Sequence, residues 1–291
     1  MTNSAAQVRD SALAAIVGLR EAWLYLLRRP VRGPRPRIGT AGIVELAALT
    51  ILIAGLTAAS MILVDPLVSG LRLRLSQGVV HLFERITELG LGSVVLWPIG
   101  LGLLAILGVM PRLAGLGRRI GASVVARLGF LFVSIAGAGL LVLVMKYALG
   151  RARPYAALHL SGPNAQLTFD WLALQSSYAS FPSGHSAIVF STAVAFAALF
   201  PRARTPLIAI AVLVASSRVI LGSHYPSDVL AGGAIAAAFT LLMVKLFAAR
   251  RLVFCVAGDG AIRPKPGPAA RHLARLVPPS APQTAFEEAR S

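Results

Sequence analysis

The chain has 291 residues, of which 56% are hydrophobic and only 13% are charged, and its apolar residues fall in long runs. This composition excludes an ordinary soluble globular protein and is typical of an integral membrane protein. The net charge of +17 suggests nucleic-acid binding at first sight, because basic chains attract polyanions. The positions of the charges argue against a nucleic-acid partner.

The N-terminal 40 residues are basic and broken by prolines, and we interpret residues 1–40 as a cytoplasmic segment with an interfacial amphipathic helix at residues 11–27. A membrane-spanning helix needs ~20 mostly apolar residues, and six later stretches qualify. The fold class is therefore predicted to be all-α, with six transmembrane helices in a domain at residues 41–250. The six stretches lie at about 41–64, 91–110, 125–149, 185–200, 206–223 and 227–248.

The distribution of basic residues predicts how this bundle is oriented. On a six-span topology, 21 of the 28 Lys and Arg residues fall on one side, which the positive-inside rule assigns to the cytoplasm. We therefore expect a multi-pass protein of the cell (inner) membrane with both termini in the cytoplasm. Four of the other seven basic residues lie in or beside the motifs described below, so these motifs are expected to face the periplasm or the exterior.

Three segments outside the spans also carry expectations. Residues 65–90 alternate apolar and polar side chains, which predicts an outer interfacial helix. Residues 151–182 form the longest outer loop, and loops of this length often cap a functional site. Residues 251–291 are rich in Pro, Ala, Arg and Ser and are expected to be a disordered cytoplasmic tail. The single cysteine, Cys255, excludes an internal disulfide.

His224 and Asp228 stand four residues apart at the start of the last span. A carboxylate that reaches one imidazole nitrogen leaves the lone pair of the other nitrogen free, so this spacing suits an oriented nucleophile. Arg218 lies six residues before His224 and offers a planar fork of donors for phosphoryl oxygens. Taken singly, the His-Asp pair also fits a polar link at the membrane boundary, and Arg218 also fits an interfacial anchor.

The sequence Pro182-Ser183-Gly184-His185 stands immediately before the fourth span. A Ser-Gly turn that opens a helix exposes backbone amides at the positive end of the helix dipole, which favours anion binding. His185 would face the same anion and, when protonated, could deliver a proton to a leaving alkoxide. Pro-Ser-Gly alone is also a common turn and helix cap.

Lys146 and Arg153 flank the outer end of the third span, and Pro154 ends any helix there. Together with Arg218 they would supply three cations for the equatorial oxygens of a five-coordinate phosphorus. Arg151 is interpreted as a contact to a neighbouring side chain or to a lipid headgroup. No Cys-His cluster or run of carboxylates offers a divalent metal site on this face, so we expect neither a metal nor another cofactor.

These motifs resemble the signature of the type 2 phosphatidic acid phosphatase superfamily, which is Lys-x6-Arg-Pro, then Pro-Ser-Gly-His, then Ser-Arg-x5-His-x3-Asp. All three parts are present without substitution, and the resemblance covers roughly residues 41–250. It implies six helices with an extracytoplasmic site, catalytic roles for His224 as nucleophile, Asp228 as its partner and His185 as acid, and no metal. It assigns phosphate binding to Lys146, Arg153, Ser183, Gly184 and Arg218.

The resulting hypothesis is a membrane phosphatase that removes phosphate from a lipid phosphomonoester or pyrophosphate through a phosphohistidine, with a bell-shaped pH profile. Undecaprenyl pyrophosphate is slightly preferred as substrate; phosphatidic acid, phosphatidylglycerophosphate and lipid A phosphate also fit, because the motifs recognise the phosphoryl group. Phosphotransfer to another lipid is an alternative. A noncatalytic lipid-binding or transport protein would not need both histidines and Asp228. Haloperoxidases of the same superfamily are disfavoured because they are soluble.

Overall fold

The computed structural model of the chain describes residues 40–162 and 164–268, together with residues 17 and 20. Apart from residues 17 and 20, the expected amphipathic helix at residues 11–27 lies outside the described residues, as does the last part of the expected tail, residues 269–291. The long helices are α2 (Thr40–Leu63), α3 (Gln77–Glu88), α4 (Gly92–Val109), α5 (Gly115–Leu149), α7 (Gly184–Leu199), α8 (Arg204–Ile220) and α9 (Pro226–Ala249).

Short elements connect these helices. Two 3-10 turns, Asp65–Val68 and Leu71–Arg74, lead from α2 into α3, and Met110–Arg112 joins α4 to α5. The outer loop after α5 contains the one-turn helix α6 (Pro154–Ala157) and the 3-10 turns Ala165–Leu167 and Ser176–Tyr178, and Pro201–Ala203 precedes α8. Within the described residues, helices form almost the whole structure, which confirms the all-α fold class.

In the part of the chain that the structure describes, five helical segments are long and apolar enough to cross a membrane: Gly42–Leu63, Gln77–Arg112, Gly115–Leu149, Pro201–Ile220 and Pro226–Ala249. The remaining expected span corresponds to α7, which has 16 residues. At 1.5 Å per residue α7 is about 24 Å long, shorter than a hydrocarbon core of about 30 Å. α7 packs against α5, α8 and α9, and most of its residues from Ser186 to Ala195 are buried, so it is surrounded by protein along much of its length.

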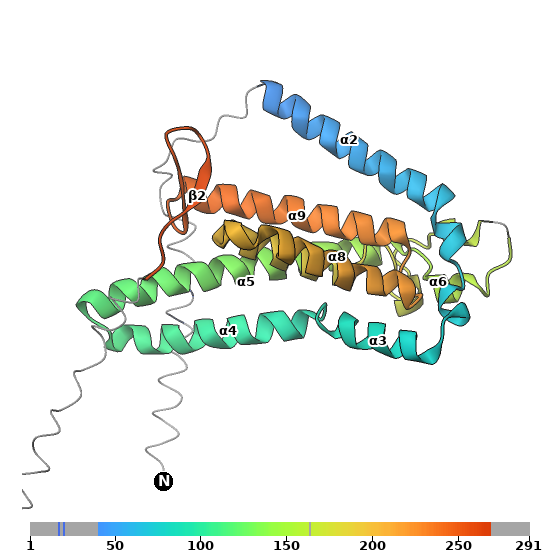
Figure 1. Cartoon of the computed structure of the whole chain (residues 1–291), viewed down its shortest axis with the longest axis horizontal. Coiled ribbons are helices and arrows are strands. Elements are labelled where there is room, and N and C mark those ends of the chain that lie inside the picture. Colours follow the sequence, from blue (N-terminus) through green and yellow to red (C-terminus); the bar gives the residue numbers. More distant parts are fainter. Residues whose placement is uncertain (1–16, 18–19, 21–39, 163, 269–291) are drawn as a thin grey trace, which may run out of the picture.

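The bundle is centred on α7, which packs against α5, α8 and α9. Figure 1 shows α2 diverging from α9. Gly232 of α9 faces the first residues of α7, where a Cβ atom would collide with the Ser183 carbonyl oxygen. The missing side chain therefore lets α9 approach the start of α7. This contact brings two of the three sequence motifs together.

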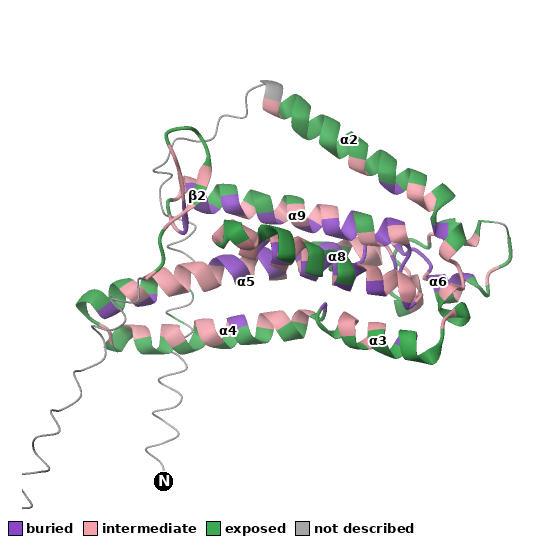
Figure 2. Cartoon of the chain, viewed as in Figure 1, coloured by how far each residue is buried: buried purple, intermediate pink, exposed green. Residues whose placement is uncertain are grey.

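The outer surface of the bundle is apolar, as expected for a protein in lipid. Figure 2 shows α2 exposed along most of its length, together with one face of α4. Ile51 on α2 is 72% exposed and Trp97 on α4 is 67% exposed. Large exposed apolar surfaces mark contacts with lipid or protein, and here they continue over several spans.

The expectation of disorder from residue 251 onward does not hold for the described part of that segment. Strands β1 (Phe254–Val256) and β2 (Ile262–Pro264) form an antiparallel hairpin. Phe254 is buried, and its ring lies 4.9 Å from the ring of Phe130 in α5. Asp259 accepts a hydrogen bond from Ala261 N at 3.0 Å and thereby closes the turn. This aromatic contact, with a residue 124 positions earlier, is not visible as a local sequence pattern.

Candidate active site

The residues singled out from the sequence all lie at one end of the bundle. Helices α5 and α8 end there and α7 and α9 begin there, close to the loop that carries α6 in Figure 1. Lys146 and Arg218 occupy the last turns of α5 and α8, and Asp228 occupies the first turn of α9. Antiparallel packing of consecutive helices therefore brings motifs up to 82 residues apart to the same place.

Direct contacts connect the three motifs. The backbone N–H of Ser183 donates to the Asp228 carbonyl oxygen at 3.0 Å. A Cβ atom on Gly184 would lie 3.3 Å from Nζ of Lys146. The charges of Lys146, Arg153 and Arg218 all act electrostatically on the His185 ring. The structure thus brings together all eight residues proposed from the sequence: His224, His185, Asp228, Lys146, Arg153, Ser183, Gly184 and Arg218.

His224 lies in the turn between α8 and α9 and is only 2% exposed. Its position is fixed by the end of α8, because the backbone N–H of His224 donates to the Arg218 carbonyl oxygen at 3.2 Å. Nδ1 of His224 lies 3.5 Å from Oδ2 of Asp228, at the outer limit of a hydrogen bond. Such contacts often tighten once a substrate is bound.

Burial controls the protonation of His224. It lowers the pKa of the imidazole to about 4, and the interactions with Asp228 offset this effect only in part. The imidazole is therefore neutral at neutral pH. A neutral imidazole has a free lone pair on one ring nitrogen, which a nucleophile requires.

Asp228 is fully buried and accepts hydrogen bonds from several directions. Its Oδ2 accepts from Ser180 Oγ at 2.6 Å and from the backbone N–H of Tyr225 at 2.8 Å, and its Oδ1 accepts from Nη1 of Arg151 at 2.6 Å. These bonds fix the carboxylate in one orientation. Ser180 and Tyr225 were not identified from the sequence, since neither residue type is unusual at the start of a helix or in a loop.

Arg151 is one of the residues whose environment differs from the sequence interpretation. The expectation of a possible headgroup contact is wrong, because the side chain is 0% exposed. Its guanidinium binds two carboxylates, Asp228 at 2.6 Å and Asp65 at 2.9 Å. It also lies over the Tyr225 ring, with 4.4 Å between the guanidinium carbon and the ring centroid. The other alternative, a contact to a neighbouring side chain, is confirmed.

The three motif cations lie close enough together to repel one another. The charges of Arg153 and Arg218 act on Lys146, and the nearby carboxylate of Asp228 is already bound by Arg151. Nε of Arg153 and Nε of Arg218 are buried without a hydrogen-bond partner within the described residues. Buried positive charge that lacks a counter-charge is costly. An anion bound between these side chains would relieve this cost.

The start of α7 adds backbone donors to this positive cluster. Ser183 is the N-cap residue, and its Oγ accepts from the backbone N–H of Ser186 at 3.4 Å. The first amides of α7 belong to Gly184 and His185, beside Nζ of Lys146. A helix N-terminus beside cationic side chains is a favourable site for phosphate.

The corner between α3 and α4 forms one wall of the site. The sequence indicated an outer helix in residues 65–90 that shelters or admits a lipid substrate, but it did not single out Thr87 or Gly90. Thr87 Oγ1 accepts from Nη1 of Arg218 at 3.0 Å. A Cβ atom on Gly90 would lie 3.1 Å from Cδ2 of His185. The expected interfacial helix at residues 65–90 is helical as α3 only from residue 77. The C-terminal end of α3 therefore contributes to the site, in addition to lying at the surface.

The described residues contain no group of three or more His, Cys, Asp or Glu side chains that could hold a metal ion. The groups that surround the candidate anion position are instead three cations, two imidazoles and backbone amides. This set matches the chemistry expected for direct binding of a phosphoryl group by the protein itself.

Comparisons with known proteins agree with this geometry. Residues 127–252 match the PAP2 superfamily. Over 131 residues, which are 45% of this chain, the sequence is 44% identical to a lipid A 1-phosphatase of Rhizobium johnstonii, covering 52% of that protein. Over 131 residues it is 42% identical to a lipid A 1-phosphatase of Rhizobium etli, covering 55% of that protein. The chain spans about half the length of the curated relatives it matches.

No solved structure matches the chain. The matched segment, residues 127–252, contains all three motifs and every residue of the site proposed from the sequence. The matched segment is thus similar to the PAP2 superfamily, in agreement with the resemblance to the type 2 phosphatidic acid phosphatases that the three motifs indicate.

Proposed function

We propose that this protein is a membrane-bound lipid phosphatase that uses His224 as a phosphoryl acceptor and needs no metal ion. The observation that carries the proposal is the convergence of three cations, a helix N-terminus and a buried, neutral His224 at one end of an apolar bundle. This set can hold a phosphate group, attack it and protonate its leaving group.

In the first step a ring nitrogen of His224 attacks phosphorus, and the bond from phosphorus to the lipid oxygen breaks. His185 gives its proton to that departing oxygen. Lys146, Arg153 and Arg218 bind the equatorial oxygens, on which negative charge is spread in the transition state. Asp228 holds the imidazole and stabilises the positive charge that develops on it.

In the second step water attacks the phosphohistidine and the bond from phosphorus to nitrogen breaks. His185, now neutral, takes the proton from this water, which restores the acid form for the next cycle. Inorganic phosphate leaves, and His224 is neutral again. The two histidines thus need opposite protonation states at the start of each turnover, and this requirement produces a bell-shaped pH profile.

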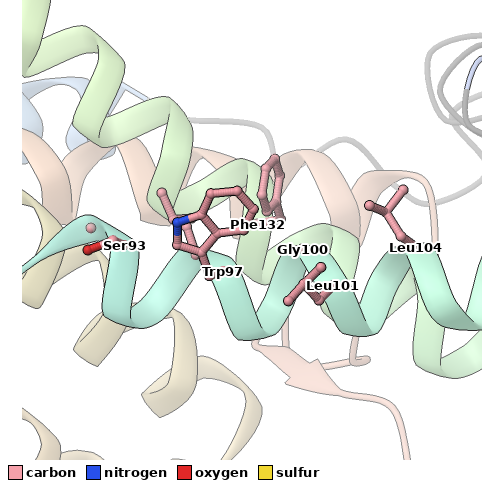
Figure 3. Close-up of a pocket in the computed structure, with 8 residues that line it drawn as sticks. Ser93, Trp97, Gly100, Leu101, Leu104 and Phe132 are labelled. Carbon is pink, nitrogen blue, oxygen red and sulfur yellow. The ribbon is translucent and has the colours of Figure 1, made fainter.

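A groove on the membrane-facing side of α4 offers a place for a lipid tail. It has a volume of about 420 Å³ and is lined by Gly92, Ser93, Trp97, Gly100, Leu104 and Phe132 among others (Figure 3). From Gly92 to Leu104 the helix rises about 18 Å, close to the depth of one leaflet, about 15 Å. Gly90, beside His185, lies two residues before the groove. We propose that an acyl chain of the substrate occupies it.

The relatives make a lipid A type phosphate the first substrate to test. Both are named lipid A 1-phosphatases, whereas the sequence alone slightly favoured undecaprenyl pyrophosphate. The phosphate-binding residues recognise the phosphoryl group, so the choice of lipid depends on contacts outside the three motifs. The side of the membrane is part of the proposal: the site lies at the end of the bundle away from Arg118, Arg119 and Arg251, and therefore faces outward.

The proposal is tested with purified protein in detergent and an excess of EDTA. Phosphate release is measured with lipid A 1-phosphate, undecaprenyl pyrophosphate, phosphatidic acid and phosphatidylglycerophosphate. We expect release from at least one of these lipids by the wild type and by His81→Ala, whose imidazole is exposed, and none by His224→Ala. Loss of activity in EDTA, or full activity of His224→Ala, would overturn the proposal.

The acyl-chain groove has its own test. Gly100→Leu fills the groove, since a Cβ atom at Gly100 already meets Phe132 at 3.5 Å. We expect this variant to raise KM for a long-chain lipid phosphate and to leave KM for a short-chain, water-soluble phosphate unchanged. Gly108→Leu on the same helix is the matched control, because nothing lies within 4 Å of its Cβ position. Equal KM values in both variants would exclude the groove as the lipid site.

A further inference from the structure

We propose that Asp65 is a positioning residue for the His224–Asp228 pair and acts through Arg151. This inference rests on the proposed function, in which His224 is the nucleophile. It concerns a residue outside the segment that matches the PAP2 superfamily, because that segment begins at residue 127. Asp65 belongs to the 3-10 turn that follows α2, the first described span.

Asp65 is 0% exposed and is satisfied almost entirely by the start of α9 and by Arg151. Its Oδ1 accepts from the backbone N–H of Ser227 at 3.1 Å, and its Oδ2 accepts from Ser227 Oγ and from Nη2 of Arg151 at 2.9 Å. Ser60 Oγ donates to the same carboxylate at 3.2 Å. The carboxylate therefore ties the end of the first span to the first turn of α9, which also carries Asp228.

Arg151 is the link between the two acids. Nη1 contacts Oδ1 of Asp228 at 2.6 Å and Ser227 Oγ at 2.7 Å, whereas Nη2 contacts Asp65. The carbonyl oxygen of Gln166 accepts from Nε at 2.9 Å and from Nη2 at 2.7 Å. Because all three nitrogens of the planar Arg151 guanidinium donate to partners in different directions, the orientation of the guanidinium is fixed.

The charges of this group explain why a second acid is present. Arg151 with Asp228 alone would form a neutral pair, and Asp228 would stabilise a positive charge on His224 only weakly. Asp65 adds one negative charge, so the three buried side chains carry a net charge of −1. Asp65 thereby holds the guanidinium in place and neutralises its positive charge. The negative charge of Asp228 is then free to stabilise the His224 imidazole, which becomes positive during phosphoryl transfer.

The experiment compares Asp65→Asn with Asp170→Asn, whose carboxylate is exposed in the outer loop. We measure kcat, KM and the acidic limb of the pH profile of kcat/KM. For Asp65→Asn we expect kcat to fall about 10-fold, as is common when an outer hydrogen-bond partner is lost, with KM within about 2-fold. Asp170→Asn should match the wild type in all three quantities.

The acidic limb of the kcat/KM pH profile distinguishes a positioning role of Asp65 from a purely structural one. His224 faces Asp228, Arg153, Arg218 and His185, and loss of the Asp65 charge makes its surroundings more positive. The limb should therefore move to lower pH in Asp65→Asn. A structural defect would lower the melting temperature and the fraction of active protein and leave the limb in place.

Ser227→Ala is a milder variant that keeps both charges and removes the hydroxyl that bridges Asp65 and Arg151. We expect a smaller decrease in kcat, with the acidic limb unchanged. The inference is overturned if folded Asp65→Asn or, should that variant not fold, folded Ser227→Ala retains the wild-type kcat. Failure of the proposed function is distinct: in that case the wild type itself would not depend on His224.

Discussion

Among the described residues, His81 and His224 each lie next to a carboxylate, and their surroundings differ completely. In α3, Nδ1 of His81 is 3.2 Å from Oε2 of Glu84, and the histidine side chain is 74% exposed. Between α8 and α9, Nδ1 of His224 is 3.5 Å from Oδ2 of Asp228, and that side chain is 2% exposed. The shorter pair lies at the surface, where ion pairs contribute little.

The difference shows that a short distance between a histidine and an acid is not enough to make a catalytic pair. Glu84 is shared with Arg72 at 3.1 Å in an exposed position. Asp228 accepts hydrogen bonds from Ser180, Tyr225 and Arg151 and is fully buried. Burial and the fixed carboxylate give His224 a single orientation, and burial lowers its pKa. The His81 side chain has neither this burial nor a carboxylate held in place.

The largest expected effect comes from removing the imidazole of His224. His224→Ala should reduce kcat by about 10⁴-fold or more, as for loss of other catalytic nucleophiles, and His81→Ala should leave it unchanged. Phosphate release in EDTA measures both variants. Similar rates for the two variants would remove the distinction between the sites.

The two acids provide the next test. Asp228→Asn should lower kcat by about 10³-fold, because the amide no longer stabilises a positive imidazole and no longer neutralises the buried Arg151. Glu84→Gln should have no effect on kcat. The same assay, with protein quantified after size-exclusion chromatography, separates loss of catalysis from loss of folded protein. Substantial activity in Asp228→Asn would contradict the role given to the carboxylate.

A third prediction concerns the wall that α3 and α4 build beside His185. Gly90→Ala would place a Cβ atom 3.1 Å from His185 Cδ2 and 3.2 Å from Val214 Cγ1, and such crowding costs about 1–3 kcal/mol. We expect lower kcat and a lower melting temperature. Gly78→Ala in α3 has open space around it and should be neutral or slightly stabilising. Equal behaviour of the two variants would show that the corner does not form part of the site.

The smallest effect concerns the pH dependence of the wild type. Burial lowers the pKa of His224 to about 4, so the imidazole loses its lone pair only when the pH falls through that value. The acidic limb of kcat/KM should therefore lie near pH 4, well below the ordinary histidine pKa of about 6.5. A pH series with a soluble short-chain phosphate measures it. A limb near pH 6.5 would mean that burial does not control the protonation of His224.

Much of the site follows from the sequence because its motifs are local and lie at the ends of apolar runs. The apolar runs predict antiparallel spans, and antiparallel spans bring Lys146, His185 and Asp228 to one side. The family resemblance adds roles to these positions. The structure places these residues at one end of the bundle, while their catalytic and phosphate-binding roles stay predictions.

The parts that sequence analysis missed depend on contacts between distant segments. Asp65 and Arg151 are 86 positions apart, and nothing in either local sequence indicates the other. Asp65 directly follows a span, and an acid at the end of a span could have been considered functional on that ground alone. The β-hairpin was missed for a related reason, since its strands have three residues each and depend on packing against Phe130.

The central claim, that His224 accepts the phosphoryl group, is tested most directly by the stereochemistry of hydrolysis at phosphorus. A substrate whose chiral thiophosphoryl group carries one heavy oxygen isotope is hydrolysed by the purified protein in water enriched in the other heavy isotope, and the configuration of the released inorganic thiophosphate is determined. Two successive in-line displacements, first by His224 and then by water, predict overall retention of configuration. Inversion would mean that water attacks the substrate directly, and it would contradict the account.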